Sequence, residues 1–231
     1  SAPGQYNGEA VDYAFDESAS SILTMLQSHG YQVANNRVVR DPDGETIPEF
    51  TFTVAGESQD HPAWQMFQKA KEVLGKIGIS VKVKTDAFAL QKLAQGQLSV
   101  WAAAWSSTID PDMYQVYHKD STAGSTLNWG YAAIKRDRSK YAYEAMVIDE
   151  LSKIIDEART TLDDTPMTGT RAQKYRKALE LVMELAVEMP TYQRNDLTVY
   201  NNNKLKAATL NQAPTAFDGL FSRIWEVGYI R

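Results

Sequence analysis

The feature that most constrains the fold is a regular alternation of strand and helix patterns in the first half of the chain. Two segments alternate apolar with polar residues, as half-buried strands do, and a third is almost continuously apolar. Apolar residues recur at helical spacing between them. We predict strands over 50–54, 79–83 and 98–104 and helices over 63–77 and 86–96. Parallel strands joined by helices have this order, so the chain is expected to be α/β with right-handed crossovers.

Signals at the ends of these elements support the assignment. Pro62 suits the first turn of its helix, and Asp86 suits the N-cap of the next. Before the alternating region, the residues from Asp16 to His29 have the spacing of an amphipathic helix, with Asp16 as the cap and Gly30 at the end. Residues 41–44, Asp-Pro-Asp-Gly, form a turn sequence, and a hairpin is predicted between 37–40 and 47–54. A calcium loop at this turn is disfavoured because the distal acidic ligands are absent.

The second half of the chain is expected to be a long loop followed by two helices. Residues 114–128 are polar and irregular, so a surface loop is predicted there. The apolar positions of the first helix run from Val147 to Leu162. The second helix is predicted to begin with a capping box of Thr170 and Gln173, to continue to Met189 and to end before Pro190. Residues 191–200 are predicted to form a strand, and the last thirty residues have little periodicity.

Composition excludes several classes of function. The 231 residues contain 24 Lys+Arg and 29 Asp+Glu, a net charge of −5, and no basic run, so nucleic acid is not an expected partner. The absence of cysteine excludes thiolate metal sites and thiol chemistry within this segment. No apolar run approaches the roughly 20 residues of a membrane span. The first residues carry no signal peptide, and the sequence reads as a chain entered in the middle.

Motifs for common enzyme chemistry are also missing. Nucleophile-elbow, zinc-helix, phosphate-loop and dinucleotide patterns do not occur, and no cofactor or metal is implied. His29, His61 and His118 are isolated from one another, so each is expected at the surface or at a helix end. Asp110 and Asp112 flank Pro111, and a turn is expected there rather than the paired carboxylates of a hydrolase. The chain is therefore expected not to be an enzyme, with a carboxylate-dependent hydrolase as the alternative from that class.

The candidate ligand site follows the third predicted strand. Ligands of parallel α/β sheets bind beyond the carboxyl ends of the strands, and residues 105–110 occupy that position. Trp105 can stack on a ligand or pack in the core, and the sequence leaves both open. The hydroxyl groups and the charge that follow can make hydrogen bonds. The candidate residues in this stretch are Trp105, Ser106, Ser107, Thr108 and Asp110. A second polar and aromatic wall is predicted from Asn128, Trp129 and Tyr131.

These residues carry a resemblance to a known family. A strand that ends in Trp, then small polar residues, Asp-Pro-Asp, Tyr-His and Asn-Trp-Gly-Tyr resembles the carboxyl-terminal lobe of the family 5 extracellular solute-binding proteins. That family serves ABC importers of oligopeptides, dipeptides, nickel chelates and some oligosaccharides. The order and spacing of the segments carry the likeness over nearly the whole chain. The other matching segments are Leu26–Tyr31, Asp41–Gly44, Leu74–Val81 and Tyr175–Arg194.

The resemblance implies one lobe of a type II periplasmic-binding-protein fold, a mostly parallel sheet flanked by helices. Residues 1–231 would form the carboxyl-terminal lobe, and about 191–231 would be the segment that returns through the hinge. The implied partners are a small solute, ABC permease subunits and the missing amino-terminal lobe. An extracellular or periplasmic location follows, with a membrane anchor on a lipidated Cys outside this segment. The same fold can also present a ligand to a receptor in sensing, which the sequence does not distinguish from transport.

Two classes of solute are compatible with the sequence. Peptide-binding members place an Asp shortly after the Trp to pair with the α-amino group of the ligand. The matching positions here are Ser106, Ser107 and Thr108, and Asp110 corresponds better to the turn Asp of the family. Family frequency favours an oligopeptide-like solute, whereas the hydroxyl groups and indole rings would suit an oligosaccharide. The oligopeptide is kept as the first expectation.

Overall fold

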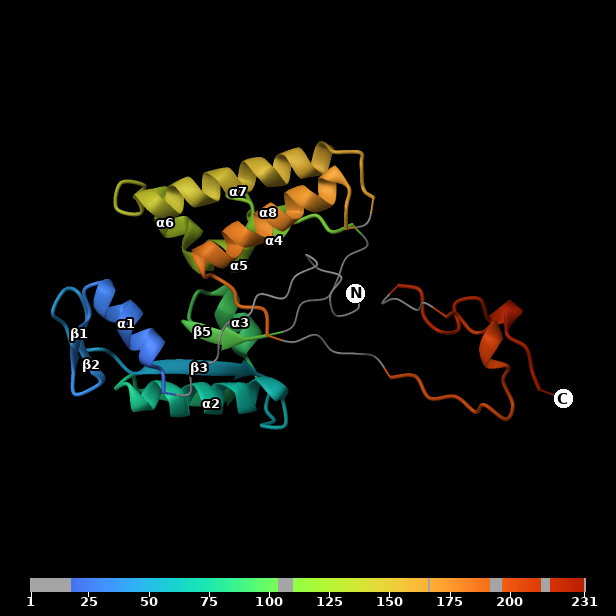
Figure 1. The fold of residues 1–231 in the computed structure, drawn as a ribbon, viewed down its shortest axis with the longest axis horizontal. Coiled ribbons are helices and arrows are strands. Elements are labelled where there is room, and N and C mark those ends of the chain that lie inside the picture. The colour runs from blue at the N-terminus through green and yellow to red at the C-terminus, as the bar shows by residue number, and fades with distance from the viewer. Residues whose placement is uncertain (1–17, 104–109, 166, 192–196, 213–216, 231) are drawn as a thin grey trace. The chain divides into compact units, whose positions relative to one another are not determined.

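The computed structural model describes residues 18–103, 110–165, 167–191, 197–212 and 217–230 (Figure 1). The chain divides into two compact units. The sheet unit comprises residues 11–105 and 122–132, and the helical unit comprises residues 1–10, 106–121 and 133–231. No helix among the described residues combines the length and the apolar character that crossing a bilayer requires.

A three-stranded parallel sheet forms the centre of the sheet unit. Its order is β4-β3-β5, with Phe50 opposite Val81 and Phe52 opposite Val100. The connecting helices α2 and α3 make two strand–helix–strand crossovers, and this confirms the predicted α/β order. The elements are β3 (Phe50–Ala55), α2 (Pro62–Lys76), β4 (Val81–Asp86), α3 (Ala89–Ala94) and β5 (Val100–Ala102).

The helix α2 lies along the sheet because one of its faces is apolar (Figure 1). The Phe67 ring meets the Phe52 ring of β3 edge to face, with their centroids 5.0 Å apart. On another part of its surface, Val73 packs with Ile77 and with residues of α1 (Ser20–Ser28). Pro62 occupies the first turn of α2, as predicted, and the His61 Nδ1 accepts a hydrogen bond from the Ala63 N–H at 3.1 Å. His61 is thus a helix-end histidine, as expected.

The predicted hairpin is wrong in its strand partners. The antiparallel pair is β1 (Gln32–Ala34) with β2 (Arg37–Arg40), whereas β3 joins the parallel sheet. The two residues between β1 and β2, Asn35 and Asn36, both have positive φ, 52° and 58°. Asparagine tolerates this conformation, and two such residues make the tight turn that suits a hairpin. Residues 41–44 still form the predicted turn, in which the Gly44 N–H donates to the Asp41 carbonyl at 3.0 Å.

Of three predicted helix signals, one is untested and two differ from the structure. Asp16 lies outside the described residues. Asp86 ends β4, and the N-cap of α3 is Phe88, which has no capping side chain. The Thr170–Gln173 capping box does not form, because the Asp163 carboxylate accepts from the Thr170 N–H at 2.8 Å and so takes the place of the cap. A carboxylate brought in by the preceding loop satisfies the same donors that a local cap would satisfy.

The predicted surface loop over 114–128 is also wrong, since short helices occupy much of it. The polar residues act as helix signals: the Asp112 Oδ1 accepts from the Tyr114 N–H at 2.9 Å at the start of α4. Gly130, with φ of 105°, bends the π-helical segment. The elements are α4 (Tyr114–Tyr117), α5 (Gly124–Thr126), the π-helical segment Leu127–Tyr131 and α6 (Ala132–Arg136).

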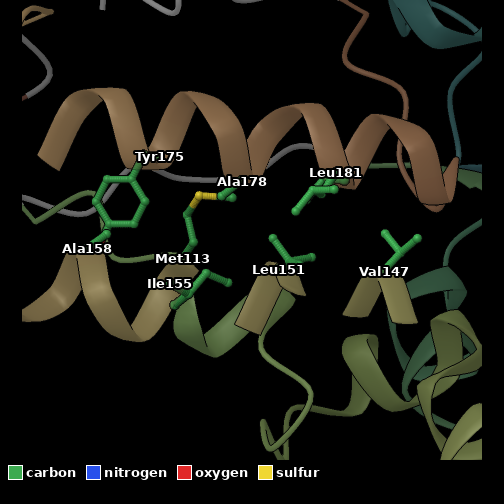
Figure 2. Packing of buried hydrophobic residues seen from close by; sticks show 9 residues of the cluster. Met113, Val147, Leu151, Ile155, Ala158, Tyr175, Ala178 and Leu181 are labelled. Atoms are coloured by element: carbon green, nitrogen blue, oxygen red, sulfur yellow. The ribbon is translucent and has the colours of Figure 1, made fainter. Parts of the chain in front are cut away.

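Two long helices, α7 (Ala142–Thr160) and α8 (Thr170–Leu185), form the core of the helical unit, as predicted. Figure 2 shows Leu151, Ile155 and Ala158 of α7 facing Tyr175, Ala178 and Leu181 of α8, with Met113 between the helices. Helix α8 ends at Leu185, earlier than the expected stop before Pro190. Ala186 takes φ of 52° there, and Val187 packs against the same core. The left-handed conformation of Ala186 ends α8, and the chain after it places the partly buried Val187 against this core.

The carboxyl-terminal segment has little regular structure, as expected. Its described residues contain two short 3-10 turns, Ala207–Thr209 and Ile224–Glu226, and one isolated bridge between Leu205 and Tyr229. The predicted strand over 191–200 does not appear in its described part, and residues 192–196 lie outside the described residues.

Candidate functional site

Most of the predicted ligand-binding stretch lies beyond what the structure describes. Residues 104–109, which include Trp105, Ser106, Ser107 and Thr108, are outside the described residues. The structure does place β5 in the parallel sheet, with Ala102 opposite Val54. The chain thus continues from the carboxyl end of a sheet strand into the predicted stretch, and the role of these four residues stays a prediction.

Asp110 is held by the helical unit. Its Oδ1 accepts a hydrogen bond from the Arg171 Nη2 at 2.6 Å, and the Arg171 Nε donates to the Ala158 carbonyl at 3.2 Å. Hydrogen bonding to Asp110 raises the pKa of Arg171. One guanidinium therefore joins the end of α7, the start of α8 and the Asp-Pro-Asp turn. Asp110 thus has a structural contact in the helical unit, and its ligand role stays a prediction.

Asp112 makes a second link to the same helices. Its Oδ2 lies 3.0 Å from the Arg159 Nε, and the Arg159 guanidinium lies 4.4 Å from the centroid of the Tyr114 ring. The Tyr114 ring in turn stacks on the His118 imidazole at 4.1 Å. The two carboxylates that flank Pro111 each pair with an arginine.

His118 ends α4 and is thus a helix-end histidine, as expected, and it is buried, with 3% of its surface exposed. Its Nδ1 accepts from the Asp120 N–H at 3.0 Å, and its Nε2 lies 3.4 Å from the Asp156 Oδ2. With Nδ1 accepting, the neutral ring carries its proton on Nε2, where it faces a carboxylate. Both nitrogens are thus used to hold the turn after α4.

The predicted second wall belongs to the sheet unit. The Asn128 amide donates to the Leu93 and Ala94 carbonyls at 2.8 and 3.2 Å and so holds the end of α3. Tyr131 is fully buried, and burial raises the pKa of its hydroxyl to about 12. Trp129 is half-buried. Two of the three residues therefore have a clear structural role, and the ligand role of all three stays a prediction.

The structure adds residues that the sequence reasoning missed, at the carboxyl end of β4. The Gly56 N–H donates to the Asp86 carbonyl at 3.1 Å, which places Asp86 at the edge where β3 also ends. The Asp86 Oδ2 lies 2.5 Å from the Lys92 Nζ and 3.6 Å from the Lys84 Nζ. The ring of Phe88 is 66% exposed beside them. The signal in the sequence was the position of Phe88 shortly after a predicted strand, the same kind of position that selected Trp105.

Of the comparisons with known proteins, the comparison with solved structures finds matches. No protein-family model and no curated protein sequence matches the chain. Solved structures do match: the oligopeptide-binding protein AppA from Bacillus subtilis with a nonapeptide is 18% identical with a TM-score of 0.57. The oligopeptide-binding protein from Thermus thermophilus with a pentapeptide is 19% identical with a TM-score of 0.54. NikA from Brucella suis with Fe(III)-EDTA is 18% identical with a TM-score of 0.53.

The match covers most of this chain but only a part of each of these proteins. In all three comparisons 79% of this chain is covered, against 33% of AppA, 30% of the Thermus protein and 33% of NikA. The chain thus spans about a third of the length of these binding proteins. The expected resemblance is confirmed at the level of the fold, and the chain has the fold of one part of a type II periplasmic binding protein.

Proposed function

We propose that the chain is the carboxyl-terminal lobe of a solute-binding protein that delivers its solute to an ABC importer. The observation that carries the proposal is the partial structural match, which covers most of this chain and about a third of each binding protein. A chain of this extent supplies one wall of a cleft and needs a second lobe for the other. Solute binding then closes the two lobes over the ligand, and no covalent chemistry is required.

An oligopeptide-like solute is the first proposal for the ligand. The Bacillus and Thermus proteins hold a nonapeptide and a pentapeptide, which favours this class for a chain of the same fold. An oligosaccharide is the alternative, and the run of hydroxyl side chains at Ser106, Ser107 and Thr108 favours it. With Trp105, Asp110, Asn128, Trp129 and Tyr131, these residues make up the proposed ligand site.

Residues from about 191 to the end are proposed to return through the hinge and pack on the amino-terminal lobe. Trp225 is 77% exposed and Leu197 is 88% exposed in this segment. Indole and aliphatic side chains gain free energy when a surface covers them. We further propose that the protein works with ABC permease subunits and is extracellular or periplasmic, with a lipid anchor upstream of this segment.

The experiment that tests the proposal is mass spectrometry of the protein from its native host. The intact mass first shows whether the mature protein contains a second lobe, and denaturation then releases any bound solute. Masses that resolve into amino-acid residues support the peptide, whereas masses spaced by hexose units support the saccharide. A mature protein of this length alone, or one that never yields or binds a solute, contradicts the proposal.

A matched pair of variants then tests the site. Trp105→Ala in the two-lobe protein is expected to weaken binding of the identified solute about ten-fold or more, because stacked aromatic anchors contribute strongly. Trp64→Ala on α2, outside the proposed site, is the control and is expected to leave the affinity unchanged. Equal affinity of the Trp105 variant and the wild type, with both folded by circular dichroism, contradicts a ligand-facing Trp105.

A further inference from the structure

The carboxyl end of β4 presents an aromatic ring beside an excess of positive charge. Phe88 stands two residues beyond the last residue of β4 and is 66% exposed. Phenylalanine is among the residues most often fully buried, although single exposed rings are common on protein surfaces. Ligands of parallel sheets bind beyond the carboxyl ends of the strands, and Phe88 stands there. Its position and its neighbours distinguish this ring from the other exposed ones.

The backbone that carries Phe88 is held at several points. The Phe88 N–H donates to the Asp86 Oδ1 at 3.0 Å, and the Asp86 carbonyl accepts from the Gly56 N–H at 3.1 Å. At the other end of α3, the Asn128 amide donates to the Leu93 carbonyl at 2.8 Å. Hydrogen bonds thus hold the backbone that carries the ring at both ends of α3.

Two ammonium groups share one carboxylate next to this ring. The Lys92 Nζ lies 2.5 Å and the Lys84 Nζ 3.6 Å from the same oxygen, Asp86 Oδ2. The hydrogen bond from Lys92 is the largest of several effects that lower the pKa of Asp86, so this carboxylate is ionised at neutral pH. Two positive charges against one negative charge leave the group with a net charge of +1.

Phe88 and Lys92 both contact Asp86 at the start of α3. The Phe88 N–H donates to the Asp86 Oδ1 at 3.0 Å, and the Lys92 Nζ lies 2.5 Å from the Asp86 Oδ2. The Lys92 N–H also donates to the Phe88 carbonyl at 3.0 Å, the bond of a first helical turn. Both lysine side chains keep more than a third of their surface exposed, at 39% for Lys84 and 37% for Lys92. The positive charge is thus accessible to a ligand.

From this arrangement we infer that Phe88, Lys84 and Lys92 contact an apolar group of the solute that carries a negative charge, such as a carboxylate beside an aromatic or aliphatic side chain. The inference rests on the proposed solute-binding function and narrows its ligand. The net charge of +1 favours an anionic group over a neutral sugar. The carboxylate gains a charge-assisted hydrogen bond, and the ring covers the adjoining apolar surface.

The test uses the present chain and two probes that differ only in charge. N-acetylphenylalanine is an anion at pH 7, and N-acetylphenylalanine amide is neutral. Titration followed by amide resonances is expected to shift residues 86–92 with both probes and to give the anion an affinity roughly three- to ten-fold higher. Equal affinities for the two probes, or shifts elsewhere with 86–92 unmoved, overturn the inference.

Matched variants assign the effect to single side chains. Phe88→Ala is expected to weaken both probes about five-fold, whereas Phe50→Ala, an exposed ring at the opposite end of the sheet, leaves them unchanged. Lys92→Gln and Lys84→Gln are expected to remove the preference for the anion. Lys82→Gln, on the same strand but two positions further from its carboxyl end, is expected to retain that preference. Loss of the preference in the Lys82 variant as well would show a general charge effect and overturn the inference.

The same variants in the two-lobe protein separate this inference from the proposed function. If the native protein releases a solute and Phe88→Ala binds it with unchanged affinity, the Phe88 contact is wrong and solute binding stands. If the native protein neither releases nor binds any solute, the proposed function is wrong whatever the probes do. A loss of affinity for the natural solute in Phe88→Ala, with Phe50→Ala unchanged, supports both.

Discussion

The helical pair α7–α8 and the segment 197–230 are both rich in large apolar side chains. The pair buries many of them, whereas many of those in the segment are exposed. In the pair, Leu151 and Ile155 are fully buried against the facing helix (Figure 2). In the segment, Trp225 and Leu197 are exposed, and Leu210 is the buried apolar residue among its described residues. The two helices cover each other's apolar surface. The segment also contains many apolar side chains, but it does not bury them in a core of its own.

The physical reason lies in periodicity. Apolar residues three and four apart form one continuous face on a helix, and two such faces cover each other. The segment repeats no period, so it cannot gather its apolar residues on one side. Its apolar surface gains stability only where another surface covers it, which is the reason for proposing that the segment packs on a second lobe.

The largest expected effect is a core substitution in the helical pair. Leu151→Ala removes buried side-chain volume between α7 and α8 and is expected to lower the free energy of unfolding by about 3–5 kcal/mol. Urea denaturation followed by circular dichroism measures it. A loss below about 1 kcal/mol would show that the pair is as loosely packed as the segment and would remove the contrast.

The next largest effect is expected at low pH, in the loop that joins α7 to α8. Hydrogen bonds from the Thr170 and Thr165 N–H groups and the Thr165 hydroxyl lower the pKa of Asp163 from 3.8 to about 2. Because the folded pKa is the lower one, this carboxylate stabilises the fold above pH 4, and the contribution is lost as the pH falls from about 4 to about 2.

Asp163→Asn is expected to lower the melting temperature at pH 7 and to flatten its fall between pH 4 and pH 2. Thermal melts across this range measure both. Asp164→Asn, at the neighbouring position, is the control and should keep the wild-type pH profile. Identical profiles for the two variants would contradict the role of Asp163 at the start of α8.

A smaller effect is expected from the ion pair that ties the Asp-Pro-Asp turn to α8. Arg171 and Asp110 lie 2.6 Å apart, but the Asp110 side chain is largely exposed, so solvent screens the pair. A double-mutant cycle of Arg171→Gln and Asp110→Asn is expected to give a coupling energy of about 0.5–1 kcal/mol that falls in 1 M salt. A coupling of zero would mean that the turn is held without this pair.

The smallest expected effect is in the exposed segment. Trp225→Ser is expected to change the unfolding free energy of this chain by less than about 0.5 kcal/mol, because the indole is largely exposed. In the two-lobe protein the same substitution is expected to destabilise the fold clearly, since the second lobe would cover the ring. Chemical denaturation of both forms checks this. A large effect in the isolated chain would show that the segment has a core of its own.

Local periodicity predicted the order of the elements well. The strands β3, β4 and β5 and the helices α2, α7 and α8 lie where their patterns placed them, because alternation and helical spacing are properties of the nearby residues alone. Turns with a required positive φ, at Gly30 and Gly44, were equally readable. The likeness to the solute-binding proteins likewise depended on an ordered series of short local segments.

Part of the candidate site was also readable from the sequence, through the rule that ligands lie beyond the carboxyl ends of parallel strands. That rule selected the stretch after β5, but it applies equally to β4, where Phe88 and Lys92 went unnoticed. Their signal is weak in the sequence, because Lys84 reaches Asp86 from within β4 and Lys92 reaches it from α3. Whether the side chains of Lys84, Asp86, Phe88 and Lys92 lie close together depends on how the chain passes from β4 into α3.

The sequence by itself determined where the main helices and strands lie, because those preferences depend on neighbours within a few positions. Only the tertiary structure decided the partners: that β2 pairs with β1 and β3 with β4, that Asp163 begins α8, and that His118 is buried between Tyr114 and Asp156. A hydrogen bond or a buried contact between residues far apart in the chain is selected by the free energy of the whole fold. No local pattern records that choice.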